Sequence, residues 1–228
     1  MISHKREFGL GMGMMAAFLV ILVLMFIPLF KGHNGLEYLD DLYNSISKGS
    51  AYYIPAAKEE AAKFAANRVE IDLEMNSPEQ AKQSVDLFMK SGAMVNVDGS
   101  SLHVSGDLGR ILENALEDAD KMYYNEGQAV TAKYGGDERR VLYNWWTAFK
   151  EMEKSLKKQK KFKEAKVVDL ASKKAVETAY NYYGIAPQSI TDEIGVVIFS
   201  LIFYVLYTLW YGFAIMFMFE GWGMQLSH

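Results

Sequence analysis

Two long apolar segments, one near each end of the chain, constrain its fold most strongly. Residues 8–30 and 194–219 contain no charged side chain, and almost all the charge of the 228-residue chain lies between them. With a rise of about 1.5 Å per residue, a helix over either segment crosses a hydrocarbon core of about 30 Å. The sequence therefore predicts a membrane protein in which two transmembrane helices flank an extramembrane domain over residues 31–193.

The orientation of the chain depends on few charges. Lys5 and Arg6 precede the first apolar segment, and positive residues favour the cytoplasmic side. We therefore expect residues 1–7 and 220–228 in the cytoplasm, the domain in the periplasm, and the chain in the cell inner membrane. A cleaved signal peptide is the alternative for the first segment, but the segment is too long and no small-residue cleavage site follows it.

Three small residues are spaced four apart on the first predicted helix: Gly9, Gly13 and Ala17. Such a stripe lets a neighbouring helix approach closely, although glycine is also common in membrane helices for other reasons. We interpret it as a helix-packing face. The neighbour could be the second span, another copy of the chain or a different subunit.

The extramembrane domain is predicted to be α+β and mainly helical. Helical spacing of apolar residues extends over about 36–66 and 137–183, separated by a unit at about 68–124 in the order strand, helix, strand, strand, helix. This βαββα order resembles half of a ferredoxin-like arrangement, with two helices on one face of a three-stranded sheet. The resemblance implies no chemistry. Residues 124–136 read as a polar connection.

Local signals mark where elements of the βαββα unit begin and turn. Ser77 and Pro78 suit the N-cap and first position of a helix, with Gln80 as the reciprocal partner of a capping box. Asp98 and Gly99 are typical of a tight hairpin turn.

Adjacent tryptophans, Trp145 and Trp146, lie in a strongly amphipathic predicted helix. Tryptophans in such a helix most often anchor a core, and the functional alternative is a partner or membrane-surface contact.

The densest charge in the chain is a run of lysines between residues 154 and 166. Its default interpretation is a solvated helix surface, and the functional alternatives are contacts with anionic lipid headgroups or with an acidic partner. The residues concerned are Lys154, Lys157, Lys158, Lys160, Lys161, Lys163 and Lys166.

Metal and cofactor sites are not expected. Glu113, Glu117 and Asp120 share one helix face, but without a histidine or a tight glycine loop they indicate a solvated surface. The apolar segments contain no histidine to bind an intramembrane haem, and His33, just outside the first segment, would contact at most a cofactor of another subunit. We therefore predict no cofactor and no metal.

Composition removes further classes of function. The net charge of −4 gives no basic footprint for nucleic acid. The chain has no cysteine, which excludes disulfides and thiolate metal sites within it. No nucleotide-binding or hydrolase motif is present, so we do not expect an enzyme.

The expected function is that of a non-catalytic accessory subunit of a multi-subunit inner-membrane complex, respiratory or transport. Its partners would be membrane lipid and other integral membrane subunits or copies of itself. The alternatives are a homo-oligomeric channel with two helices per subunit and a membrane-tethered extracytoplasmic binding or assembly factor. The segments 1–7 and 220–228 are too short for a signalling domain, so we do not expect a self-contained receptor.

Overall fold

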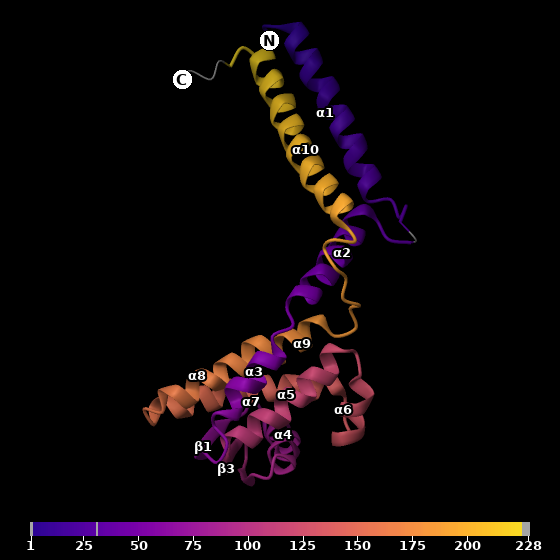
Figure 1. Cartoon of the computed structure of the whole chain (residues 1–228). Helices are drawn as coiled ribbons and strands as arrows, with labels where there is room; N and C mark the ends of the chain where they lie inside the picture. The colour runs from indigo at the N-terminus through magenta and orange to yellow at the C-terminus, as the bar shows by residue number, and fades with distance from the viewer. Residues whose placement is uncertain (1, 31, 225–228) are drawn as a thin grey trace. The chain divides into compact units, whose positions relative to one another are not determined.

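The computed structural model describes residues 2–30 and 32–224, which form two compact units. One unit, here called the span unit, consists of Met1–Ser47 and Pro187–His228, and the other, the central unit, is Lys48–Ala186. The chain is mainly helical, with one three-stranded sheet in the central unit and two candidate membrane-spanning helices near its ends (Figure 1). The expected mainly helical α+β composition is therefore confirmed.

In the span unit, α1 (Lys5–Met25) and α10 (Ile194–Gly221) lie side by side as an antiparallel hairpin (Figure 1). The backbone N–H groups of Ser3 and His4 both donate to the carbonyl of Gly221, at 2.9 and 3.0 Å. The start of α1 is thus joined to the end of α10, which places both on the same side of the hairpin.

The first span differs from its predicted bounds of 8–30. Its helix begins at Lys5 and ends at Met25, with Phe26 as the C-cap. Pro28 lacks an N–H group and disfavours helical backbone in the residue before it, so the apolar segment outlasts the helix. Over 21 residues α1 is still about 31 Å long, enough to cross a bilayer core.

Two helices follow α1 along the chain. In α2 (Gly35–Ser50), the Asn34 side chain accepts the N–H groups of Leu36 and Glu37, while Glu37 accepts the N–H of Asn34. This reciprocal pair satisfies backbone donors at the helix start. The next helix, α3 (Ile54–Ala62), has Pro55 in its first turn, where a missing backbone N–H leaves no helical hydrogen bond unmade.

The sheet consists of β1 (Arg68–Glu74), β2 (Met94–Asp98) and β3 (Ser101–Asp107) in the order β1-β3-β2, all antiparallel. Between β1 and β2 lies α4 (Pro78–Lys90), and α5 (Leu108–Tyr123) follows β3. Asp98 pairs with Ser101 across the hairpin, and Gly99 has a φ of +59°. The turn is therefore the glycine-dependent hairpin that the sequence predicts.

Alternation along the strands buries one face of the sheet. Val69, Ile71, Leu73, Leu102 and Val104 are buried on this face. Three helices contact the strands: α4, α5 and α7 (Glu138–Lys158). The third, α7, lies against β1 and was not part of the two-helix cover expected for the unit, because its sequence is remote from the strands.

The capping box of α4 forms with a modification. Ser77 Oγ accepts the N–H of Gln80, as predicted. Gln80 Oε1 accepts the backbone N–H of Asn76 at 3.1 Å rather than that of Ser77. The Gln80 side chain also donates to Asn144 and Thr147, so the cap ties α4 to α7.

Most of α5 is buried between α3, α7 and the helical segments that follow α5 and α7 in the chain. The segment 124–136, expected as a loop, contains the short helix α6 (Gly127–Tyr134), whose Val130 is buried. The predicted helix over 164–183 forms α8 (Phe162–Ala171), a π-helical turn η1 (Ser172–Val176) and α9 (Glu177–Tyr182). The π-helical turn has no local signal in the sequence, whereas α6 ends at Gly135, whose φ of +73° is the left-handed conformation typical of a glycine at a helix C-terminus.

Candidate interaction surfaces

The two spans touch at a glycine outside the predicted stripe. A Cβ added at Gly11 would lie 2.7 Å from the Met218 backbone nitrogen and 2.8 Å from the Ala214 carbonyl oxygen. A Cβ at Gly9 or Gly13 would meet no atom within 4 Å. These two predicted residues do not pack against α10, and a contact between the stripe and another helix stays a prediction.

Aromatic side chains of α10 add hydrogen bonds to this contact. Tyr207 donates to the Phe18 carbonyl at 3.0 Å, and the Trp210 indole donates to the Met14 carbonyl at 3.1 Å. The rings of Phe18 and Tyr207 stack with centroids 4.2 Å apart. These donors lie among apolar groups and therefore need a hydrogen-bond partner within the protein. In each case the partner is a helix carbonyl that also accepts a backbone hydrogen bond.

An apolar cleft of about 690 Å³ opens in the span unit where the hairpin meets α2. Ser200 lines it, and the Ser200 hydroxyl donates to the Val197 carbonyl and lies 2.7 Å from the Tyr43 hydroxyl. Aliphatic and aromatic side chains make up most of its walls. The lining residues are Ile21, Leu24, Met25, Leu29, Phe30, Gly35, Tyr38, Leu39, Val196, Phe199, Ser200 and Phe203.

In the central unit, the uncovered face of the sheet is polar. Asp72 on β1 lies opposite His103 on β3, with 2.7 Å between Asp72 Oδ1 and His103 Nδ1. Glu74 accepts the hydroxyls of Ser100 and Ser101, and these bonds hold the pKa of its carboxyl below the ordinary value. The pairs are exposed, and within the part of the chain that the structure describes no three potential ligands gather into a metal site.

The predicted lysine cluster, residues 154–166, covers the end of α7, the turn at 159–161 and the start of α8 (Phe162–Ala171), and is here called the lysine turn. Lys154 pairs with Glu151 at 3.2 Å, and Lys157 pairs with Glu153. Glu164, the only acid within the cluster, accepts a bond from Asn67 instead. No ion pair to a described residue is formed by the other five lysines: Lys158, Lys160, Lys161, Lys163 and Lys166.

Backbone hydrogen bonds lock the lysine turn. Lys161 N–H donates to the Leu156 carbonyl at 2.9 Å and Lys160 N–H to the Lys157 carbonyl at 3.0 Å, the Schellman pattern of a helix end. Lys160 has a φ of +61°, in the left-handed region that favours glycine. The Gln159 side chain donates to the Glu70 carbonyl at 2.8 Å and fixes the turn to β1.

The tryptophan pair is divided between core and surface. Trp145 is fully buried, packs against Phe88 and Phe149, and offers no surface to a partner. Trp146 is half-buried at the edge of the core, with the Lys150 ammonium 3.9 Å from its ring centroid. Only Trp146 retains the exposure that a partner contact requires.

A buried polar cluster around Asp118 was not singled out from the sequence. The carboxylate, with no exposed surface, accepts bonds from Lys133 Nζ at 2.7 Å, the Tyr134 hydroxyl at 2.6 Å and the Trp145 indole at 2.9 Å. Burial, followed by the nearby Asp118 charge, raises the pKa of the Tyr134 hydroxyl. Because every bond is made, the cluster joins α5, α6 and α7 as a structural element.

Lys48 is a second buried charge that the sequence did not reveal. Its ammonium donates to the carbonyls of Tyr182 and Ile185 at 3.0 and 2.6 Å and to the Asn125 side chain at 3.1 Å. Burial lowers the pKa of this lysine, and its acceptors are neutral. The carbonyls near the end of α9 supply the negative partial charge that holds the ammonium there.

The acidic face over Glu113, Glu117 and Asp120 is engaged in part. Asp120 binds the Tyr52 hydroxyl at 2.8 Å and Lys58 Nζ at 2.6 Å. Glu113 and Glu117 line a mixed groove of about 500 Å³ between α3 and α5. This arrangement fits ion pairing and solvation.

Taken together, these features define a mainly helical α+β protein with two candidate membrane-spanning helices. Its strongest sites are surfaces: an apolar cleft and a basic turn. No family model matches the chain, and no curated protein or solved structure is similar to it.

Proposed function

We propose that this chain is a non-catalytic accessory subunit of an inner-membrane complex, respiratory or transport, anchored by α1 and α10. In this proposal, the termini are cytoplasmic and the central unit is periplasmic. The apolar cleft of the span unit receives a transmembrane helix of another subunit, while the βαββα layer and the helices around it form a domain for contacts outside the bilayer.

The observation that carries the proposal is the large apolar surface of α1 and α10 that stays exposed when the two helices pack together. In each candidate span, only 6% of the most apolar 18-residue stretch is buried in the structure, whereas a core helix of a soluble protein would be mostly buried. Large side chains such as Phe199 and Leu201 are exposed, at 66% and 57%. A cleft of about 690 Å³ among such residues suits the ridge of another apolar helix.

The polar groups of α10 favour a subunit over a homo-oligomeric channel. Ser200 donates to the Val197 carbonyl, and Thr208 donates to the Tyr204 carbonyl at 2.7 Å. A water-filled pore needs polar groups turned toward water, whereas each of these two hydroxyls donates its hydrogen to a carbonyl of its own helix.

Cleft-filling variants test the role in assembly. We expect Val196→Trp, which fills the cleft, to abolish recovery of other membrane subunits after mild detergent extraction, measured by native mass spectrometry. Val205→Trp lies on the same helix outside the cleft lining and is the matched control. A closed ring of identical chains, or equal recovery with both variants, would contradict the proposal.

Orientation has a separate test because the chain has no cysteine. We expect a single cysteine at Gly135 to react with a membrane-impermeant maleimide in cells with a permeabilised outer membrane, and one at Ser3 to react only after the inner membrane is opened. The reverse pattern would place the central unit in the cytoplasm.

A further inference from the structure

We propose that the lysine turn binds the headgroups of anionic phospholipids, with Phe162 entering the interfacial layer of the bilayer. This surface lies in the central unit and does not require the partner helix proposed for the cleft. The two proposals therefore share only a chain held at a membrane.

The lysine turn has a strong excess of positive charge, although Lys161 also lines a groove with Glu70 and Asp72 of β1. Residues 154–166 contain seven lysines and one glutamate, which gives this segment a net charge of +6. Within the part of the chain that the structure describes, carboxylates pair with only Lys154 and Lys157 of these seven, and the partners are Glu151 and Glu153 of α7. The remaining positive charge faces solvent at a chain reversal, as a flat anionic surface requires.

Three of these lysines occupy positions that are unfavourable for folding. Lys160 has left-handed backbone, where glycine is the usual residue. Lys161 and Lys163 stand at the start of α8, where the positive end of the helix dipole disfavours cations. Because local stability favours other residues at all three positions, an external anionic ligand accounts for the lysines better than a structural role does.

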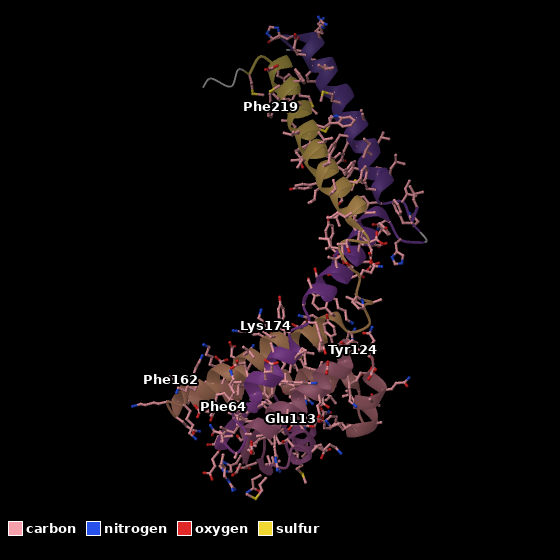
Figure 2. The ribbon with its side chains drawn as sticks, viewed as in Figure 1. Phe64, Glu113, Tyr124, Phe162, Lys174 and Phe219 are labelled. Carbon is pink, nitrogen blue, oxygen red and sulfur yellow. The ribbon has the colours of Figure 1, made fainter. Side chains whose placement is uncertain are left out.

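Phe162 distinguishes a lipid surface from an acidic protein partner. Its side chain is 64% exposed at the end of the central unit where α7 and α8 meet (Figure 2). An aromatic ring flanked by lysines matches the boundary of a bilayer, where the charges contact headgroups and the ring enters the acyl region. The Schellman hydrogen bonds and the Gln159 side chain already fix the backbone of the turn. Binding therefore costs little conformational entropy.

A fluorescent label in the cysteine-free chain tests this binding. The full chain carries Phe162→Cys with an environment-sensitive dye and is reconstituted in nanodiscs of phosphatidylcholine, alone or mixed with phosphatidylglycerol. Phosphatidylglycerol vesicles are also added to the neutral nanodiscs. We expect a blue shift of the dye with phosphatidylglycerol in the discs or the vesicles. A dye at Lys82→Cys, exposed on α4, should not shift.

Lysine variants that carry the same dye test whether the response comes from the lysines or from binding of the dye itself to the lipid. With the same label, K158Q/K160Q/K163Q should weaken the response to phosphatidylglycerol about a hundredfold, at roughly fivefold per lysine. The control K63Q/K82Q/K121Q removes three exposed lysines elsewhere in the central unit and should leave the response unchanged. High salt should abolish the response of the parent chain.

The inference would be overturned if the dye at position 162 showed no blue shift either in nanodiscs that contain phosphatidylglycerol or in neutral nanodiscs with added phosphatidylglycerol vesicles. An equal response of the two lysine triples would also overturn it, as would binding of polyglutamate without binding of phosphatidylglycerol. Recovery of partner subunits is measured independently through Val196→Trp, so failure of one proposal is distinguishable from failure of the other.

Discussion

The indole of Trp145 on α7 donates a hydrogen bond to the carboxylate of Asp118 on α5, at 2.9 Å, and both side chains are fully buried. The same carboxylate pairs with Lys133 of α6. One acid thus connects three helices of the central unit, including the short helix α6, whose N-cap Glu126 makes no side-chain cap hydrogen bond.

Asp118→Asn should destabilise the central unit by about 3 kcal/mol, because it leaves the partly buried Lys133 ammonium without its counter-ion. Thermal unfolding of the full chain in mild detergent, followed by near-ultraviolet circular dichroism of its aromatic side chains, measures the change. Asp169→Asn is the control: it removes an (i, i+4) pair with Lys173 near the surface, and the expected loss is below about 1 kcal/mol. Equal losses would contradict a structural role for the Asp118 cluster.

Glycine variants of α1 should separate contact within the hairpin from contact with other subunits. Gly11→Ala inserts a methyl group against the Met218 and Ala214 backbones and should cost about 1–3 kcal/mol. Its effect is visible as a changed distance between spin labels on α1 and α10. Gly9→Ala and Gly13→Ala meet open space and should leave that distance unchanged. If the predicted stripe of Gly9, Gly13 and Ala17 packs on a partner subunit, these two variants should reduce the recovery of that partner and leave the hairpin unchanged.

Local chemistry explains which elements were predictable. The alternation of β1, the Ser77 cap and the Asp98-Gly99 turn depend on neighbouring residues, and each appears where expected. The helix α6 depends instead on tertiary packing: Gly127 begins it because a side chain there would collide with Tyr183 and Glu138. No local signal carries that information.

The candidate surfaces were predictable to different degrees. The lysine turn follows from composition, but the left-handed backbone of Lys160 and the exposure of Phe162 do not. Asp118 had an overlooked signal: it falls three residues after Ala115 and four before Met122, within the apolar stripe of α5. The contact at Gly11 depends on how α1 is rotated toward α10, which a helix rich in small residues does not determine.

Lys160→Gly should stabilise the central unit by about 1 kcal/mol, because glycine adopts left-handed backbone without steric cost. Lys160→Ala retains that cost and is the matched control. Both variants remove one charge from the lysine turn, so both should weaken the response to phosphatidylglycerol while only the first raises the melting temperature. A glycine variant no more stable than the alanine variant would mean that the turn carries no strain.

The buried ammonium of Lys48 should make the stability of the central unit depend on pH in a defined direction. Burial lowers its pKa in the folded chain below the ordinary 10.5. Between the lowered pKa and 10.5 the unfolded chain therefore binds more protons at this site, and the free energy of unfolding rises with pH. Above about pH 10 the buried Tyr123, whose pKa is raised by burial, acts in the opposite direction.

The rise attributable to Lys48 should therefore be measured from neutral pH to just below pH 10, by thermal unfolding of the full chain. Lys48→Met should abolish it and, near neutral pH, cost about 1–3 kcal/mol, because the carbonyls of Tyr182 and Ile185 lose their donor. Lys121→Met removes an exposed lysine of α5 and should retain the rise. A rise that persists in Lys48→Met would assign the pH dependence to other groups, and the ammonium would then be no more costly to bury than to leave in water.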